Sequence, residues 1–266
     1  MIKMVATDID GTILNWDGHF SPVVVECINN LVKSDVKVVL VTGRMHGSTK
    51  PIADMLGLKT PIVSYQGGLV KDYNNQTLYE AKVSSDYAKE IIKWGRENNI
   101  HLNLYLDDKL YVEEDNDTIK RYIQGKFVDY TVCSFDTLNI ENVNKLLAID
   151  YQDADKVTGW VEYLENKYKD LYIVKSTPYF CEIGSLNATK SAGVDCLRKY
   201  WGFDKSEVLT IGDQNNDIEL LKAGGVAVAM GNATEELKKY ADYITDTVEN
   251  DGFAKAIEKF VGVLNV

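Results

Sequence analysis

The sequence predicts an α/β protein that has a parallel-sheet core and an inserted second domain. Short apolar stretches alternate with helical patterns over the first eighty residues, and the same alternation resumes near residue 190. Such alternation is typical of a parallel sheet with helices on its faces. The hundred residues between mix strands and helices in another order. We therefore expect a core made of residues 1–83 and 188–266 and an inserted domain at 84–187, and 266 residues suffice for both.

The first segment of the core begins with a short apolar strand, Met4-Val5-Ala6-Thr7. Ser21-Pro22 then has the residue types that start a helix, with an N-cap followed by proline at the first helical position. The following expected elements are a strand at 36–41, a helix to about Leu56 that Gly57 ends, and a strand at 61–65. A hairpin is expected after Gly67-Gly68, with its turn at Asn74-Asn75.

The insert is expected to contain helices at 87–98, 119–123 and 157–168, and strands at 101–106, 110–114, near 130, at 171–176 and at 179–183. The region near Val143 is expected to be a helix, although 145–151 is open to a strand because its apolar residues fit neither period. In the second core segment we expect helices at 190–201, 217–223 and 235–240 and strands at 207–211, 225–230 and 243–245. An amphipathic helix follows Asp251-Gly252.

Composition excludes several function classes. The formal net charge of −11 argues against binding to nucleic acid or to anionic membranes, which favour basic surfaces. No apolar run approaches the roughly 20 residues of a membrane helix, and the N-terminus enters the first strand directly, so we expect a cytoplasmic protein without a signal peptide. The four cysteines are scattered and are expected to be reduced thiols.

Two carboxylates follow the first strand. Asp8 and Asp10 stand at its carboxyl end, where ligands bind in open α/β sheets. Like charges this close repel each other, and a hard divalent cation such as Mg²⁺ would stabilise them through their oxygens. The pair therefore predicts a metal site at this edge of the sheet.

Four stretches together resemble the motifs of the haloacid dehalogenase superfamily of phosphatases. They are Asp8-Ile9-Asp10-Gly11-Thr12, Thr42-Gly43-Arg44, Lys190, and Gly212-Asp213-Gln214-Asn215-Asn216-Asp217. The insert between the second and third stretches, together with Gly231-Asn232-Ala233 and Asp251-Gly252, resembles the Cof-type branch, which has a Rossmann-like core and a large α/β cap. One departure is Gln66, because this branch usually has asparagine there.

The resemblance implies a role for each motif residue. Asp8 would be the nucleophile that forms an aspartyl-phosphate, and Asp10 would protonate the leaving alcohol and then activate water. An aspartate in the position of Asp10 argues against a dehalogenase. Phosphate would be held by Thr42, Gly43, Lys190 and Asn216, with the free N–H groups of a helix N-terminus after Thr42 as a physical reason. Mg²⁺ would be held by Asp8, Asp10 and Asp213, with Asp217 in support.

The function implied is a Mg²⁺-dependent phosphatase of small phosphorylated metabolites, in particular sugar phosphates, acting as a monomer or weak homo-oligomer. A phosphomutase and a non-catalytic regulatory protein on the same fold are the alternatives. The cap is expected to read the leaving group, but its residues are not evident from the sequence. Among its polar side chains, Glu113, Asn116 and Glu182 are expected to be solvated, and Tyr105, Tyr111 and Tyr122 are expected to pack on the sheet.

Overall fold

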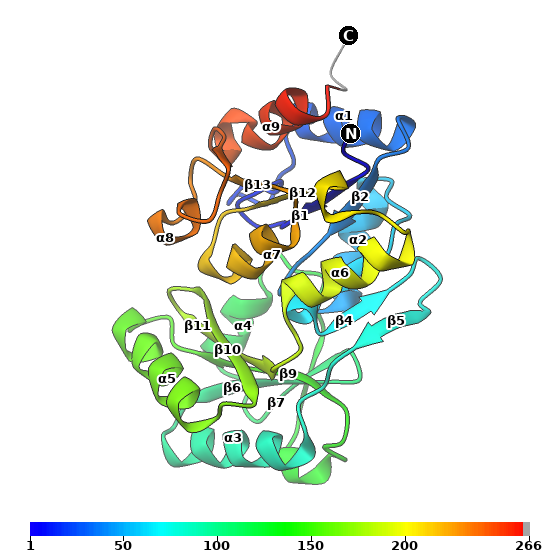
Figure 1. Cartoon of the computed structure of the whole chain (residues 1–266). Helices are drawn as coiled ribbons and strands as arrows, with labels where there is room; N and C mark the ends of the chain where they lie inside the picture. Colours follow the sequence, from blue (N-terminus) through cyan, green and yellow to red (C-terminus); the bar gives the residue numbers. More distant parts are fainter. Residues whose placement is uncertain (263–266) are drawn as a thin grey trace.

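A computed structural model describes residues 1–262 of the chain. Figure 1 shows two lobes, each built on its own sheet, with the core above and the inserted cap below. The core sheet is parallel and the cap sheet is mixed, which confirms the predicted fold class. No helix in the described part of the chain is long and apolar enough to cross a membrane.

The core sheet has five parallel strands in the order β14-β13-β12-β1-β2. Its strands are β1 (Met4–Thr7), β2 (Lys37–Leu40), β12 (Val208–Gly212), β13 (Val226–Ala229) and β14 (Tyr243–Ile244). Strand β1 is central, and its Met4 lies opposite Lys37 on one side and Val208 on the other. The strand that carries Asp8 at its end is therefore enclosed on both edges.

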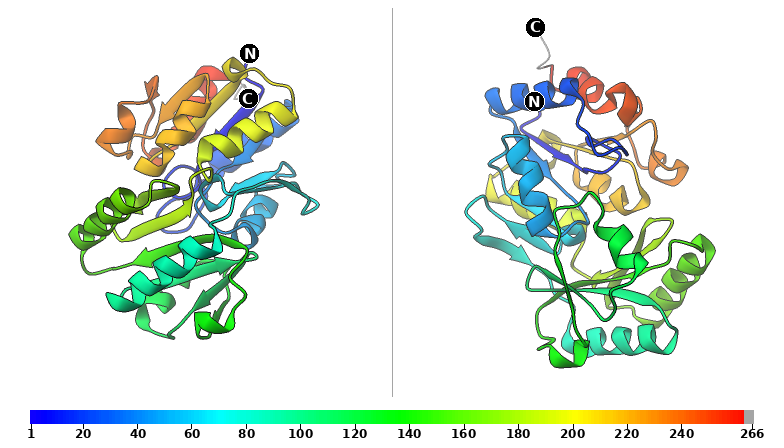
Figure 2. Two further views of the ribbon diagram at one scale, coloured as in Figure 1. Left: turned by 60° about the horizontal axis from the view of Figure 1, so that its bottom comes forward. Right: turned by 180° about the vertical axis from the view of Figure 1, so that it is seen from behind.

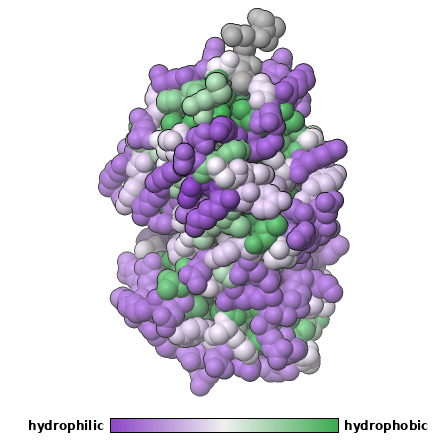
Figure 3. Space-filling view, turned by 45° about the vertical axis from the view of Figure 1, so that its right-hand side comes forward, coloured by the Kyte–Doolittle hydropathy of each residue, from purple (hydrophilic) through white to green (hydrophobic). Residues whose placement is uncertain are grey.

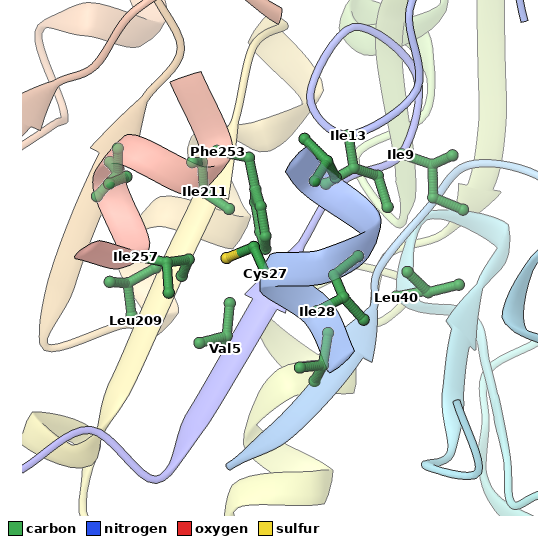
Figure 4. Packing of buried hydrophobic residues seen from close by; sticks show 14 of the residues in the cluster. Val5, Ile9, Ile13, Cys27, Ile28, Leu40, Leu209, Ile211, Phe253 and Ile257 are labelled. Atoms are coloured by element: carbon green, nitrogen blue, oxygen red, sulfur yellow. The ribbon is translucent and has the colours of Figure 1, made fainter. Parts of the chain in front are cut away.

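Helices cover both faces of this sheet. Helices α1 (Pro22–Lys33) and α9 (Gly252–Phe260) bury Cys27 and Phe253 against the face that includes Val5 (Figure 4). Helices α6 (Lys190–Tyr200) and α7 (Ile218–Ala223) pack on the opposite face, which includes Met4 and Ala6. Alternate residues of β1 thus point to opposite faces, as expected for a strand buried on both sides.

Shorter elements complete the core. Helix α2 (His46–Met55) begins at the cap, where the amide of His46 meets Asp108, and runs into the core (Figure 2). Helix α8 (Glu235–Lys238) lies beside the fourth motif. A second, three-stranded sheet contains β3 (Ile62–Ser64), β4 (Leu69–Lys71) and β5 (Thr77–Glu80). A bridge between Val41 and Val63 joins β3 to the end of β2. The predicted hairpin is present, with Asn75 at a φ of 66° in its turn.

The cap sheet has six strands in the order β10-β11-β9-β6-β7-β8. They are β6 (His101–Leu106), β7 (Lys109–Val112), β8 (Tyr130–Val132), β9 (Val143–Ile149), β10 (Leu171–Thr177) and β11 (Phe180–Ser185). Helices α3 (Ser85–Glu97) and α5 (Ala154–Lys167) cover the face turned away from the core (Figure 1). The other face packs against α4 (Asp117–Ile123) and against Met45 and Tyr65 of the core.

The helix predicted near Val143 is wrong, and the alternative of a strand at 145–151 is the correct one, because residues 143–149 form strand β9. This strand lies between β11 and β6 in the cap sheet, and all seven of its residues are buried. Burial on both faces removes the alternation that would have marked it as a strand. The other predicted helices and strands are present within a few residues of their expected bounds.

The face in Figure 3 is mostly hydrophilic, with hydrophobic residues in small separate areas. All four cysteines are free thiols, as the sequence predicted.

Candidate active site

A cavity of about 370 Å³ is lined by residues of the first, second and fourth motif stretches and by the cap. Its core side includes Asp8, Asp10, Thr42, Gly43, Gln66 and Asn216, and its cap side includes Tyr122, Lys126, Lys145, Phe180 and Glu182. This volume lies in the range of small-molecule pockets, about 300–1,000 Å³. Residues far apart in the sequence therefore meet in one space large enough for a small metabolite.

Lys190 joins the first and fourth motifs. It is the first residue of α6, behind the N-cap Thr189, and its side chain has no exposed surface. Its Nζ lies 2.5 Å from Asp8 Oδ1 and 2.5 Å from Asp217 Oδ1. Burial alone would lower the pKa of Lys190, but the two carboxylates raise it above its ordinary value. The structure therefore holds a fixed positive charge directly beside Asp8.

Asp8, Asp213 and Asp217 form a buried acidic cluster, in which one carboxylate oxygen from each residue lies within 4.8 Å of the other two. Burial raises the pKa of Asp8 well above its usual range, in spite of Lys190, and burial together with Asp217 raises that of Asp213 to about 7. The cluster has three buried carboxylates, and Lys190 bonds to only two of them, Asp8 and Asp217. Hard oxygen donors are the ligands that Mg²⁺ prefers. The donor set therefore fits a divalent cation.

The side chains of the cluster are held in place by the fourth motif itself. Asp217 Oδ2 accepts hydrogen bonds from the backbone amides of Asp213 (2.9 Å) and Gln214 (3.0 Å). Asp213 accepts from Thr12 Oγ1 (3.1 Å) and Gln214 Nε2 (2.9 Å). A Cβ on Gly212 would lie 2.6 Å from the Cβ of Asp217, so only glycine fits there. The turn thus fixes both aspartates before any ligand binds.

The Asp10 carboxylate lies outside this cluster. Arg44 donates to it from Nε (2.8 Å) and from Nη2 (2.5 Å) in a bidentate pair. Burial alone would raise the pKa of Asp10, but the pair with Arg44 lowers it below its ordinary value. Asp10 is therefore held as a carboxylate at the edge of the cavity, by an arginine to which the sequence analysis gave no role.

The loop after β2 brings Thr42 and Gly43 to the cavity. A Cβ on Gly43 would lie 2.3 Å from Gln66 Nε2, so the Gln66 amide rests directly on this glycine. Asn216 Nδ2 donates to Gln66 Oε1 at 3.1 Å. Gln66 Nε2 and Asn216 Oδ1 are buried and have no hydrogen-bond partner among the described residues. Polar groups in need of partners thus gather at the cavity wall.

A residue of the cap accepts hydrogen bonds at the N-terminus of helix α2, which follows this loop. Asp108, in the turn between β6 and β7, accepts hydrogen bonds from the amides of His46 and Gly47, both at 3.0 Å, and from the hydroxyl of Tyr65 at 2.6 Å. The first amides of α2 are therefore occupied by a carboxylate of the same chain. The residues expected to hold phosphate in this region, Thr42 and Gly43, lie in the preceding loop, which faces the cavity.

The cap also places a buried ion pair against the same loop. Lys145 on β9 lies 2.5 Å from Glu182 on β11, and its Nζ donates to the carbonyl oxygen of Gly43 at 2.7 Å. Ser176 donates to the other oxygen of Glu182 at 2.8 Å. The expectation of a solvated Glu182 is wrong, since the residue is only 6% exposed. The network connects the cap sheet to the loop that carries Thr42.

Some of the other cap residues line this cavity, and others lie elsewhere in the cap. Tyr105 packs in the sheet as expected, whereas Tyr122 and Lys126 line the cavity. Glu113 instead pairs with Arg96, and Asn116 caps α4. A charged residue within an apolar strand was the only sequence signal for Lys145, and nothing in the sequence singled out Lys126.

Comparisons with known proteins identify the family of the chain. A family model described as haloacid dehalogenase-like hydrolase matches residues 5–257. The chain is 30% identical over 261 residues to the 5-amino-6-(5-phospho-D-ribitylamino)uracil phosphatase YcsE of Bacillus subtilis, covering 98% of this chain and 96% of that protein. It is 28% identical over 267 residues to a protein named putative phosphatase from Haemophilus influenzae, with 97% and 98% covered.

Solved structures show the same likeness. The crystal structure of TM0651 from Thermotoga maritima matches with a TM-score of 0.83 at 30% identity, covering 98% of each chain. A haloacid dehalogenase-like hydrolase from Bacteroides thetaiotaomicron matches with a TM-score of 0.86 at 26% identity, covering 97% of this chain and 99% of the other. These matches confirm the resemblance drawn from the four motifs: the chain belongs to the haloacid dehalogenase-like hydrolase family, and its curated relatives place it among the phosphatases of that family.

Proposed function

We propose that the chain is a Mg²⁺-dependent phosphatase that hydrolyses small phosphorylated metabolites of the sugar-phosphate class through an aspartyl-phosphate on Asp8. The observation that carries this proposal is the position of Asp8. Its carboxylate ends the central strand, faces the cavity and lies 2.5 Å from a fully buried lysine. A carboxylate at a substrate cavity is a known nucleophile in phosphoryl transfer.

In the proposed first step an oxygen of Asp8 attacks phosphorus, and the bond from phosphorus to the leaving oxygen breaks. Asp10 protonates the leaving alcohol, for which it must first take up a proton and loosen its pair with Arg44. In the second step Asp10, again ionised, accepts a proton from the water that attacks phosphorus, the bond from phosphorus to the Asp8 oxygen breaks, and inorganic phosphate leaves. Arg44 keeps Asp10 ionised at rest, and their pair must loosen whenever Asp10 takes up a proton.

Thr42 Oγ1, the amide of Gly43 and Lys190 would hold the phosphoryl oxygens in our proposal. Asn216 and Gln66 would complete this shell, because each has a buried amide atom that lacks a partner. Gln66 thus takes part although the branch usually has asparagine there.

The side chains of Asp8 and Asp213 and the backbone carbonyl of Asp10 would hold Mg²⁺, with Asp217 orienting them. The cation supplies charge neutralisation where two anions meet, and two unit charges 4 Å apart interact by about 4 kcal/mol at an effective dielectric of 20.

We also propose that the two domains have separate roles. The core, residues 1–83 and 188–266, supplies the catalytic residues, and the cap, residues 84–187, selects the leaving group. The cap side chains at the cavity support this division. The substrate class is supported by the name of the Bacillus subtilis relative, because the compound in that name carries its phosphate on a ribityl chain. A cavity of about 370 Å³ suits a leaving group of this size.

The test is phosphate release from a panel of sugar phosphates and a generic aryl phosphate, with and without Mg²⁺. We expect metal-dependent turnover that Asp8→Asn abolishes. Interconversion of phosphate isomers without phosphate release would show a phosphomutase instead. No turnover of any compound would favour a regulatory protein, and turnover that survives Asp8→Asn would show that another residue is the nucleophile.

A further inference from the structure

In the part of the chain that the structure describes, one cation of the active-site cavity has no anionic partner. Arg44, Lys126 and Lys145 all line the cavity. Arg44 is paired with Asp10, and Lys145 with Glu182. Within residues 1–262, no carboxylate oxygen lies within 4.0 Å of Lys126 Nζ. Lys126 is therefore the cavity cation whose charge remains available to a ligand.

Aromatic side chains hold Lys126 at the cap side of this cavity. It follows α4, where its amide donates to the carbonyl of Ile123 at 2.9 Å. Its Nζ lies 3.7 Å from the ring centroid of Tyr122 and 5.6 Å from that of Phe180. Ring faces attract a cation but do not neutralise it or use up its N–H donors. The ammonium therefore stays free to donate hydrogen bonds into the cavity.

The electrostatic surroundings agree with this reading. Burial lowers the pKa of Lys126 to about 8. Of the charges that face it, Asp10 and Glu182 raise this pKa, whereas Arg44 and Lys145 lower it. A partly desolvated cation without a counter-ion costs free energy, which an incoming anion would offset. The phosphoryl group is not that anion in our scheme, because Asp8, Thr42 and Lys190 place it in the core.

We infer that Lys126 binds a second anionic group on the leaving-group side of the substrate, a carboxylate or a second phosphate, and thereby selects phosphomonoesters that carry one. This inference rests on the proposed function, since it assigns the substrate class of the same site. Lys126 acts on specificity and takes no part in bond breaking.

The experiment compares kcat/KM within two matched pairs of substrates. The carboxylate pair is 6-phosphogluconate and glucose 6-phosphate, and the phosphate pair is fructose 1,6-bisphosphate and fructose 6-phosphate. We expect the wild type to prefer the doubly anionic member of at least one pair. Lys126→Met should reduce that preference by about 10- to 100-fold, the size of one hydrogen bond to a charged group. Lys126→Arg should retain most of it, because the charge is kept.

Lys120→Met is the matched control, because Lys120 lies on α4, is exposed and pairs with Asp115 at 3.4 Å outside the cavity. It should leave the preference unchanged. A wild type without preference in either pair, or a Lys126→Met variant that keeps it, would overturn the inference. Binding of the four compounds to Asp8→Asn, with and without Lys126→Met, can be measured by calorimetry and separates this result from failure of the proposed function. If no compound is turned over, a binding preference that depends on Lys126 would still support the assignment. The absence of such a preference would refute it.

Discussion

The buried pair of Lys145 and Glu182 gives a prediction whose size follows from the structure. The side chains are 3% and 8% exposed, so neither charge is solvated when the other is removed. Lys145→Met leaves Glu182 buried with only the hydroxyl of Ser176 as donor, and it also removes the bond to the Gly43 carbonyl. Breaking a buried pair in this way costs about 3–5 kcal/mol of the free energy of unfolding.

Urea unfolding followed by circular dichroism would measure this cost. Adding Glu182→Gln to Lys145→Met should recover a large part of it, because the amide still accepts from Ser176 and no unpaired charge remains. Lys156→Met is the control, since Lys156 pairs with Asp150 in the same lobe at 3.0 Å but is 47% exposed. That variant should lose no more than about 1 kcal/mol. Equal losses in Lys145→Met and Lys156→Met, or no recovery in the double variant, would refute the reasoning.

Three further predictions concern the cap and the metal. The preference for doubly anionic substrates should fall as the pH rises through about 8, because the ammonium of Lys126 loses its proton there. Lys126→Arg should retain the preference to higher pH, and pH profiles of the kcat/KM ratio would show this. Asp108→Ala should lower the free energy of unfolding by about 1–2 kcal/mol in thermal melts, because it uncaps α2, and a loss near zero would contradict this role. Asp213→Asn should raise the Mg²⁺ concentration needed for half-maximal phosphate release by more than about tenfold, and an unchanged titration would place the cation elsewhere.

The core of the fold was predictable from the sequence because its strands and helices alternate. Apolar runs such as Met4–Thr7 are bounded by turn residues, and caps such as Ser21 mark where helices begin. The error at β9 has a physical reason. Both faces of this strand are buried, and its polar residues Asn144 and Lys145 find partners only through tertiary contacts.

The site was predictable only on its core side. Asp8 and Asp213 follow adjacent parallel strands, so their proximity comes from the sheet itself. Lys126, Lys145 and Glu182 reach the cavity only because the cap docks on the core, and no local pattern encodes that arrangement. The same holds for Asp108, whose turn chemistry marks a hairpin but not the helix that it caps.

The central claim, that Asp8 is the nucleophile, is tested most directly by trapping the phosphorylated enzyme. A single turnover of an aryl phosphate, whose leaving group does not need a proton from Asp10, would be run with excess enzyme and Mg²⁺ and quenched in acid. Asp10→Asn would be used to slow hydrolysis of the intermediate, and the N-terminal peptide would be analysed by mass spectrometry. The account predicts one phosphoryl group on Asp8 that disappears as free phosphate forms. Turnover without any phosphorylated peptide, or a phosphoryl group on another residue, would contradict it.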